Sequence, residues 1–445
     1  MDIYTSYSVK IKHYNHVFKE TVALYRDAVN FFIAVCLAEW DILSQSKNEH
    51  ARLLYIEQIS HITTAHANVR YNFDKRFYKF PGYLRRAAIM SAIGKVSSYK
   101  SNLDNWERSD CKSRGKKPSY PKAGNSYPVL YKVGMYERTD VYEAKIKVFV
   151  HNTWDWIRVQ LRKSDVDYIN RKCVFRKECA PSLRKRGHEW FLDFPFEERV
   201  QLSDTDISDQ IVLGVDLGVN TAATVSAMRS DGTILGRHFC KLSKEYDSLT
   251  HAVNRIKKAQ QHHNYKTPRL WAKAKGINDN IAVKTASFII DMAILYSADV
   301  IVFEHLDVRG KKRGAHKQKL HMWRSQYVQS MVENKAHRLG IRISRICAWG
   351  TSRLAFDGSG VTVRGKDAGF NNYSICKFPS GKVYNCDLSA SYNIGSRYFV
   401  REIIKSLPAR ERLALEAKVP QTAKRSTCTL STLISLNAEL ASLVA

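Results

Sequence analysis

The chain has 445 residues, which is long enough for two or three domains with separate cores. Hydrophobic residues make up 44% of it and aromatic residues 11%, and this composition excludes a disordered chain. Lysine and arginine total 71 against 42 acidic residues, so the formal net charge is +29. Charge of this size opposes a compact state unless a polyanion neutralises it, and it favours nucleic acid over an anionic membrane as the partner.

The N-terminus and the cysteines predict a cytosolic protein. The opening segment MDIYTSYSVKIKHYN lacks the apolar region and the cleavage site of a secretory signal. The most apolar helical stretch, residues 29–40, is too short to cross a bilayer. Nine cysteines without paired spacing indicate reduced thiols. We therefore expect no membrane partner.

The first half of the chain changes its hydrophobic period twice. Residues 3–13 alternate polar and apolar side chains, which predicts a strand. From 17 to 105 the apolar residues recur at three- and four-residue spacing, which predicts helices. A loop with turn signals at 111–128 leads back to β alternation at 129–200. We expect the first strand to join this later sheet, so that the helical part is an insertion into a β domain.

Cations alternate with aromatic residues near the end of the helical part. Cations of this kind bind phosphates, and aromatic rings stack on bases. The alternative is a helical hairpin with a solvated basic face. The candidate nucleic-acid-binding residues here are Lys75, Arg76, Lys79, Arg85 and Arg86, interleaved with Tyr71, Phe73, Phe77, Tyr78 and Tyr83.

A different domain begins near residue 211, after a polar linker. Its pattern is three strands joined by short turns, a long basic helical stretch at 244–297, a buried strand, a helix, another strand and a last helix. Three antiparallel strands followed by alternating helices and strands are the order of an RNase H-like domain. The polar, Ser/Thr-rich tail after about 408 gives no pattern and is expected to be flexible.

Three segments of this domain place one carboxylate each at the edge of an apolar run. Asp216 ends IVLGVD, Glu304 ends DVIVFE, and Asp387 opens the last helix. Acids converging from separate elements can bind two divalent ions for phosphodiester hydrolysis. The alternatives are ordinary strand-end or helix-cap residues, or an actin-like ATPase, whose second Asp-Gly-Gly turn and Gly-rich loop we do not find.

Two further groups of cations lie near these acids in sequence. A Gly-containing basic loop follows Glu304, and the long helical stretch carries a second basic group. Either could contact phosphates, and a solvated surface is the alternative reading. The candidate residues are Arg309, Lys311, Lys312, Arg313 and Lys317 in the loop, and Arg255, Lys257 and Lys258 on the helical stretch.

The segments GVDLGVN, VFEHLD and DLSASYNI, with WGTSRLAFDGSG before the last, resemble the transposon-encoded TnpB family, relatives of the compact type V CRISPR effectors. The resemblance implies a multidomain α+β fold. A wedge-like β-barrel domain would comprise 1–16 and 121–207, a helical recognition domain 17–120, and a RuvC-like, RNase H-like nuclease domain 208–445 with an insert at about 348–386.

The resemblance also implies a function. The family cuts DNA under the direction of a guide RNA, so the implied partners are a guide RNA and target double-stranded DNA with its opened single strands, in the prokaryotic cytosol or nucleoid. The implied catalytic and metal-binding residues are Asp216, Glu304 and Asp387, with two Mg²⁺ or Mn²⁺ ions. The alternatives are a guided repressor that does not cut and a guide-free transposase. The guide sequence, its origin, the adjacent DNA motif, the cut positions and the oligomeric state are not encoded in recognisable form.

This chain departs from the family at the zinc-binding insert. Relatives carry a CxxC pair after the Thr-Ser dipeptide and a second pair before the last acid. Here the first pair falls on Ala355 and Gly358, and only Cys376 and Cys386 remain near the second. Zinc needs four ligands in a closed tetrahedral site, so we expect no structural zinc. The insert should fold instead on apolar contacts from Phe356, Phe370, Tyr373, Phe378 and Tyr384.

Overall fold

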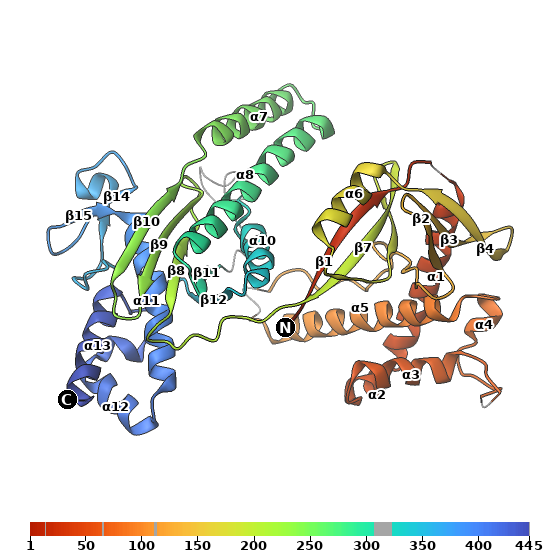
Figure 1. The fold of residues 1–445 in the computed structure, drawn as a ribbon, viewed down its shortest axis with the longest axis horizontal. Helices are drawn as coiled ribbons and strands as arrows, with labels where there is room; N and C mark the ends of the chain where they lie inside the picture. Colours follow the sequence, from red (N-terminus) through yellow and green to blue (C-terminus); the bar gives the residue numbers. More distant parts are fainter. Residues whose placement is uncertain (14, 65, 111–113, 307–322, 445) are drawn as a thin grey trace. The chain divides into compact units, whose positions relative to one another are not determined.

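A computed structural model describes residues 1–445 except 14, 65, 111–113, 307–322 and 445. The chain divides into two compact units, one of residues Asp2–Glu198 and one of Arg199–Ala445 together with Met1 (Figure 1). Each unit contains both helices and sheets. The protein is therefore a multidomain α+β protein, as the sequence predicts.

Helices build much of the N-terminal unit. The longest pair, α1 and α5, pack against each other, and α1 also packs on a strand of the same unit. By length and composition α1 could cross a membrane, but one stripe of its side chains is buried in the protein core: Phe18, Val22, Tyr25, Val29, Phe32 and Cys36. The helices are α1 (Val17–Ala38), α2 (Trp40–Gln45), α3 (Glu49–Ser60), α4 (Phe73–Arg76), α5 (Gly82–Arg108) and α6 (Lys163–Lys172).

The strands of this unit form two open sheets. One has the order β1-β7-β5 with β6 beside β7, and the other has the order β2-β3-β4. The first strand therefore joins a strand from the later β region, as expected. The strands are β1 (Asp2–Lys10), β2 (Tyr136–Asp140), β3 (Glu143–Val150), β4 (Thr153–Gln160), β5 (Lys177–Glu178), β6 (Ser182–Arg186) and β7 (Glu189–Arg199).

The predicted β-barrel is wrong for the described residues. A barrel needs a hydrogen-bonded strand ladder that closes on itself. Among the described residues, the ends of β1 and β4 meet at the single bridge Ile11–Leu161, with backbone hydrogen bonds beside it, and no strand ladder connects the two sheets. Helix α1 packs on β3, so a helix covers apolar surface that strands would cover in a barrel. Alternating hydrophobicity in the sequence predicts strands but does not tell an open sheet from a closed one.

A five-stranded sheet organises the C-terminal unit, in the order β10-β9-β8-β11-β12. The pairs β10–β9 and β9–β8 are antiparallel, and β8–β11 and β11–β12 are parallel. The strands are β8 (Ile211–Asp216), β9 (Ala223–Arg229), β10 (Ile234–Cys240), β11 (Val300–His305) and β12 (Arg342–Cys347).

Helices cover both faces of this sheet, which explains why its central strands are continuously apolar. Leu213 and Val215 pack with residues of α8 and α10 on one face, whereas Val212 packs with residues of α11 and α13 on the other. Helices α7 and α8 form a hairpin that extends past the sheet (Figure 1). The helices are α7 (Ser243–Gln261), α8 (Pro268–Leu295), α10 (Ser325–Arg338), α11 (Cys386–Ser406), α12 (Ala409–Lys418) and α13 (Leu430–Val444).

Helix α11 lies unusually close to the sheet because two glycines face each other. A Cβ at Gly214 of β8 would collide with the backbone oxygen of Ser391 and the backbone nitrogen of Gly395. A Cβ at Gly395 would in turn meet the sulfur of Met228. The absence of both side chains lets the helix backbone rest directly on β8, which fixes the position of the start of α11 over the sheet.

The insert before α11 contains a small sheet of β13 (Val363–Arg364), β14 (Ile375–Lys377) and β15 (Val383–Asn385), with a 3-10 turn at Gly365–Ala368. Its buried cluster comprises Ala355, Cys376, Phe378 and Cys386, with Phe356 and Tyr384 packed against them. Of the five aromatic residues predicted to support the insert, three are in this cluster, whereas Tyr373 is 70% exposed.

The expected flexible tail is also wrong. Residues after 408 form α12, a 3-10 turn at Pro420–Ala423 and α13, and Leu415, Leu430, Leu433 and Leu436 are buried in the same core as α11. The leucines of α13 recur at three-residue spacing, which is a helical pattern. The Ser/Thr content of the tail concealed this pattern.

Replacing Gly214 with alanine should destabilise the protein. The added Cβ has backbone atoms as neighbours, so α11 must move off the sheet, and overpacking of this kind costs roughly 1–3 kcal/mol in unfolding free energy. Gly276→Ala is the matched control, because its Cβ would meet nothing within 4 Å on helix α8; it should be neutral or stabilising. Denaturant unfolding of both variants measures the difference, and equal stabilities would contradict the close packing.

Candidate active site

Asp216 and Glu304 lie side by side on one face of the sheet. Strands β8 and β11 are parallel neighbours, and their register pairs Val215 with Phe303, the residues just before the two acids. Adjacent strands are about 4.8 Å apart, and in-register residues point to the same face. Leu213, Val215 and Phe303 point toward α8 and α10. Alternation therefore directs both acids to the face that α11 covers.

Asp387 reaches this edge from the first turn of α11. Asn385 caps the helix, accepting a hydrogen bond from the backbone nitrogen of Leu388 at 3.0 Å. The capping role considered for Asp387 thus belongs to Asn385, and the Asp387 carboxylate remains available to the site. Since Gly214 and Gly395 hold α11 on β8, the helix start lies near the end of the strand that carries Asp216.

The charges of Glu304 and Asp387 act on the carboxyl group of Asp216. Burial raises the pKa of Asp216 well above its ordinary value, and repulsion from Glu304 and Asp387 raises it further. Burial also raises the pKa of Glu304 and that of Asp387. All three residues nevertheless keep some exposed surface. The arrangement concentrates negative charge in a partly enclosed place that remains open to solvent, which favours bound cations.

Glu304 is held by groups that α11 positions. The Thr351 hydroxyl donates a hydrogen bond to its carboxylate, and this bond, together with the positive charge of Arg397, opposes the rise in the pKa of Glu304. Arg397 is buried and donates to the carbonyl oxygens of Cys347, Trp349, Ser426 and Cys428 at 2.6–2.9 Å.

The loop that carries Thr351 is fastened a second time. The Asn393 side-chain nitrogen donates to the carbonyl oxygens of Thr351 and Leu354, each at 2.9 Å, and Asn393 is fully buried. Asn393 and Arg397 are four residues apart on α11, so they share one face of the helix. One helix thus supplies an acid and also fixes the loop that orients another acid.

Arg364 is a cation whose charge acts on two of the three acids. Its positive charge lowers the pKa of Asp216 and of Asp387 against the larger effect of burial. A hydrogen bond from Thr221 acts on Asp387 in the same direction. Arg364 lies in β13 of the insert. The insert therefore contributes a charge to the site in addition to covering α11.

The donor set suits hard divalent cations. Mg²⁺ and Mn²⁺ prefer oxygen ligands, and Mg²⁺ binds through one or two carboxylates while keeping several waters. Two buried hydroxyls on β9, Thr224 and Ser226, pair across from Asp216 and Gly214, and neither has a hydrogen-bond partner within the described residues. They leave oxygen atoms beneath the acids that could hold water.

The acids are not a preformed cage for one ion. Among the described residues, no three His, Cys, Asp or Glu side chains are close enough together to hold a metal ion as they stand. Ligands supplied by water and phosphate would have to complete the coordination of an ion here. The residues therefore fit ions that bind with substrate better than a closed structural site.

The predicted cations of the N-terminal unit fall into two groups. Lys75, Arg76, Lys79 and Arg86 are exposed. Arg85 is 7% exposed and pairs with Glu57 at 2.9 Å, so it stabilises the contact between α3 and α5 and does not face solvent.

The aromatic residues interleaved with them also divide. Phe73 and Phe77 are buried in the core and stack on each other, whereas Tyr78 and Tyr83 are exposed. Tyr71 is partly buried and donates a hydrogen bond to Glu39 at 2.8 Å, and the ring of Tyr83 stacks on Tyr131. Of the predicted set, Tyr78 is therefore the ring most open to a base.

In the C-terminal unit, Arg255, Lys257 and Lys258 are exposed on α7. The other basic group, Arg309, Lys311, Lys312, Arg313 and Lys317, lies outside the described residues. Its contacts therefore stay a prediction from the sequence.

Sequence reasoning missed the residues that support the acids. Thr351 belongs to the Thr-Ser dipeptide that marks the start of the insert. Its position just after β12, the strand next to the one that carries Glu304, could have indicated that it lies near this acid. Arg364 had no signal, because its position depends on how the insert folds. Arg397 and Asn393 follow Asp387 on one helix, and a buried arginine in an apolar helix face was a signal that could have been used.

Comparisons of sequence identify the family. A model described as the Aq_aa04 family matches residues 5–150. The uncharacterized protein aq_aa04 of Aquifex aeolicus (strain VF5) is 32% identical over 120 residues, covering 26% of this chain and 67% of that protein. The TnpB-like protein aq_aa05 of the same organism is 26% identical over 235 residues, covering 47% of this chain and 74% of that protein. The chain thus belongs to the Aq_aa04 family and is similar to a TnpB-like protein, in agreement with the resemblance seen in the motifs.

Solved structures of Cas12 proteins are similar at lower identity. The Cas12f1–sgRNA–target DNA complex matches at 13% identity with a TM-score of 0.48, covering 76% of this chain and 73% of that one. CasPhi-2 (Cas12j) bound to crRNA matches at 9% identity with a TM-score of 0.41, covering 88% and 97%.

Removing one negative charge from the site should stabilise the metal-free protein. A carboxyl whose pKa is higher in the folded state than in the unfolded state makes the folded protein bind more protons, so stability falls as pH rises above the ordinary value of 3.8. Asp216→Asn removes this loss and should raise the unfolding free energy at neutral pH.

Thermal unfolding in EDTA between pH 4 and pH 8 measures this effect. The gap between Asp216→Asn and wild type should widen as pH rises. The exposed Asp291→Asn on α8 is the control and should show no such gap. A wild type that is more stable than Asp216→Asn at pH 8 without metal would contradict the electrostatic picture.

Proposed function

We propose that the protein is an RNA-guided DNA endonuclease that hydrolyses phosphodiesters in a RuvC-like, RNase H-like domain. The observation that carries the proposal is the convergence of Asp216, Glu304 and Asp387 on one sheet edge in a chain of net charge +29. The strand order β10-β9-β8-β11-β12, with α11 over the acids, supports the RNase H-like assignment. The name of the TnpB-like relative supports the same class.

The chain's own residues would divide the work between them. Asp216, Glu304 and Asp387 would hold two Mg²⁺ or Mn²⁺ ions, which when bound activate water and stabilise charge on the attacking and leaving oxygens. The Thr351 hydroxyl keeps the Glu304 carboxylate in one orientation. Arg364 would approach a phosphate oxygen, because it already interacts with two of the acids that would face that phosphate.

Guide RNA and target DNA are the partners we propose. Both similar Cas12 structures contain RNA, and one also contains target DNA. The exposed cations Lys75, Arg76, Lys79 and Arg86 and the α7 group Arg255, Lys257 and Lys258 would bind phosphates of these strands. Base pairing with the guide would read the target sequence, and the protein would read backbone shape. Such a protein would work in the cytosol, where both nucleic acids are found.

Two other functions can be distinguished from RNA-guided cleavage by experiment. A guided repressor would bind matched DNA without cutting it, and the presence of all three acids argues against that role. A guide-free transposase would join strands without RNA. Sequencing the RNA that copurifies with the protein separates the guided classes from the transposase, because a guided protein retains one abundant RNA species.

Asp216→Asn should abolish cutting and leave nucleic-acid binding intact. Metal catalysis supplies several kcal/mol of transition-state stabilisation, so its loss corresponds to roughly a thousandfold or more in rate. Binding depends on lysines and arginines elsewhere. Cleavage of a supercoiled plasmid carrying the matched target, with Mg²⁺ and the copurified RNA, measures the rate, and gel shift measures binding. Asp291→Asn should cut normally; normal cutting by Asp216→Asn would refute the acid assignment.

Thr351→Val should slow cutting without removing the acids. The substitution keeps the shape of the side chain but removes the hydroxyl that orients Glu304, and loss of such a supporting bond lowers activity or metal affinity about 10- to 100-fold. Thr362→Val is the control, since the Thr362 hydroxyl donates to the carbonyl oxygen of Arg353 at 3.2 Å and contacts none of the three acids among the described residues. Excess Mn²⁺ should partly rescue Thr351→Val, and equal rates for the two variants would argue against the role of Thr351.

A further inference from the structure

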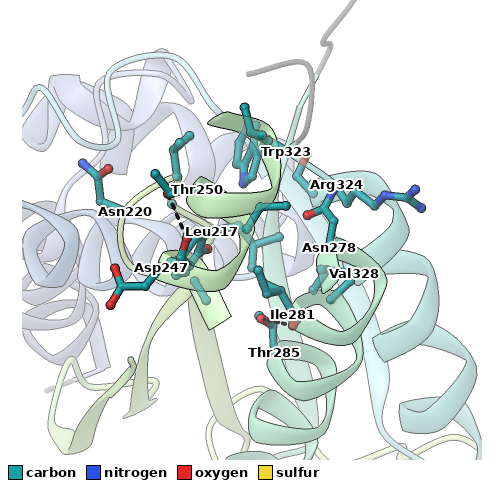
Figure 2. Close-up of a pocket in the computed structure, with 18 of the residues that line it drawn as sticks. Leu217, Asn220, Asp247, Thr250, Asn278, Ile281, Thr285, Trp323, Arg324 and Val328 are labelled. Atoms are coloured by element: carbon teal, nitrogen blue, oxygen red, sulfur yellow. Dashed lines mark hydrogen bonds between the residues drawn. The ribbon is translucent and has the colours of Figure 1, made fainter. Parts of the chain in front are cut away.

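A cavity of about 380 Å³ lies on the face of the sheet that α8 covers, opposite the face of the acids. It begins at Leu217, the residue that follows Asp216. Its walls come from the β8–β9 loop, α7, α8 and the residues just before α10, all within the C-terminal unit (Figure 2). Six of its lining residues carry the argument: Leu217, Tyr246, Asn254, Asn278, Ile281 and Trp323. Its volume is within the range of pockets that bury small ligands.

The lining combines flat apolar surface with amides. Leu217 and Ile281 are apolar, and the rings of Tyr246 and Trp323 offer surfaces for stacking. Asn254 on α7 is exposed and presents its side-chain amide, whereas Asn278 lines the cavity from α8 and is 8% exposed. An amide both donates and accepts hydrogen bonds, as does the edge of a nucleobase, and aromatic rings stack on bases of any kind.

Trp323 is held in place from one side. Arg324, the next residue, pairs with Asp279 of α8 at 2.8 Å and lies over the ring of Tyr327. Figure 2 shows Arg324 extending away from the cavity while Trp323 stands at its wall. The arginine thus fixes the start of α10, and with it the position of the indole.

The cavity lies at the same edge of the sheet as the acids. Leu217 follows Asp216 directly, and alternation along β8 turns Asp216 toward α11 and Leu217 toward α8. Both places lie at the carboxyl ends of the parallel strands, the edge where ligands bind in such sheets. The exposed Lys257, which also lines the cavity, supplies a positive charge for a phosphate at the rim.

We propose that this cavity receives one unstacked nucleobase of the strand that enters the carboxylate site. The source of the base, a strand bound for cutting, rests on the proposed nuclease function. The ability of the pocket to hold a base rests on its lining residues alone. A base held between Trp323 and Tyr246, with its edge toward Asn254, would anchor the strand next to the bond to be cut. Hydrolysis of a phosphodiester does not itself require contact with a base. The role of the pocket would therefore be to position the strand relative to the acids.

Photo-crosslinking locates the base. The full-length protein is mixed in EDTA with single-stranded DNA containing one 5-iodouracil, irradiated, and digested for mass spectrometry. The expected crosslink lies on Trp323 or Tyr246. Crosslinks only on exposed aromatic residues such as Trp271 or Tyr265 would overturn the proposal.

Three substitutions test the pocket, so that the result does not depend on a single variant that could fail to fold. Trp323→Leu should weaken binding of the strand about tenfold, as expected for losing one base–aromatic stack, whereas Trp271→Leu on the exposed surface of α8 should not. Thr250→Phe fills the cavity from the exposed side of α7 and should prevent the crosslink at an unchanged melting temperature. A crosslink that survives Thr250→Phe would overturn the proposal.

A free nucleotide is the other possible source of a base. Crosslinking with 5-iodo-dUMP alone at the same concentration distinguishes the two. Labelling of Trp323 by the strand but not by the nucleotide supports the proposal, and equal labelling overturns the assignment to the strand. Because the assay runs without metal, it does not depend on cleavage: a crosslink in a protein that fails to cut would sink the nuclease proposal alone.

Discussion

The burial of three carboxylates at one edge of the sheet is the constraint that the packing of the C-terminal unit must offset. Isolated charges of this kind are costly to bury, and a protein normally pairs them or moves them to the surface. Here the chain holds Asp216 within the electrostatic influence of Glu304 and Asp387, with Arg364 as a partial counter-charge. The fold tolerates this arrangement because helix α11 is packed backbone to backbone on β8 through Gly214 and Gly395. Close packing therefore supplies the stability that the charges oppose.

Helix α11 is the element that joins packing to chemistry. Its first turn carries Asp387, its middle holds the Thr351 loop through Asn393, and Arg397 gathers four backbone carbonyls from the segments on either side. A displacement of this helix would alter all three acids together. The C-terminal helix α13 packs against α11 through its leucines. This contact explains why the tail is folded although its sequence is rich in polar residues.

The sequence was sufficient to predict the acids and insufficient to predict what surrounds them. Asp216 and Glu304 stand at the ends of apolar strands, where a lone carboxylate is conspicuous, so pattern and physics point to the same residues. Arg364 and Thr351 reach the site through the fold of the insert, which depends on contacts between residues far apart in sequence. The barrel failed for a similar reason, since alternation within a strand carries no information on its partners.

Local charge patterns were the least reliable guide. Arg85 and Arg86 are neighbours in one basic run and both pair with Glu57, yet only Arg86 is exposed, because Arg85 lies on the side of α5 that packs against the core. Phe73 and Phe77 likewise belong to the core although they alternate with cations. The insert shows a different effect: Ala355, Cys376 and Cys386, near the positions where relatives place zinc ligands, are packed in an apolar cluster that gives the insert a core of its own.

Crystals of the protein bound to guide RNA and an uncleaved DNA strand, soaked in Mn²⁺, test the central claim most directly through anomalous scattering. We predict two peaks about 4 Å apart, as in other two-metal sites, with oxygens of Asp216, Glu304 and Asp387 around them. Peaks bound elsewhere, or an empty site with a strand in place, would contradict the account.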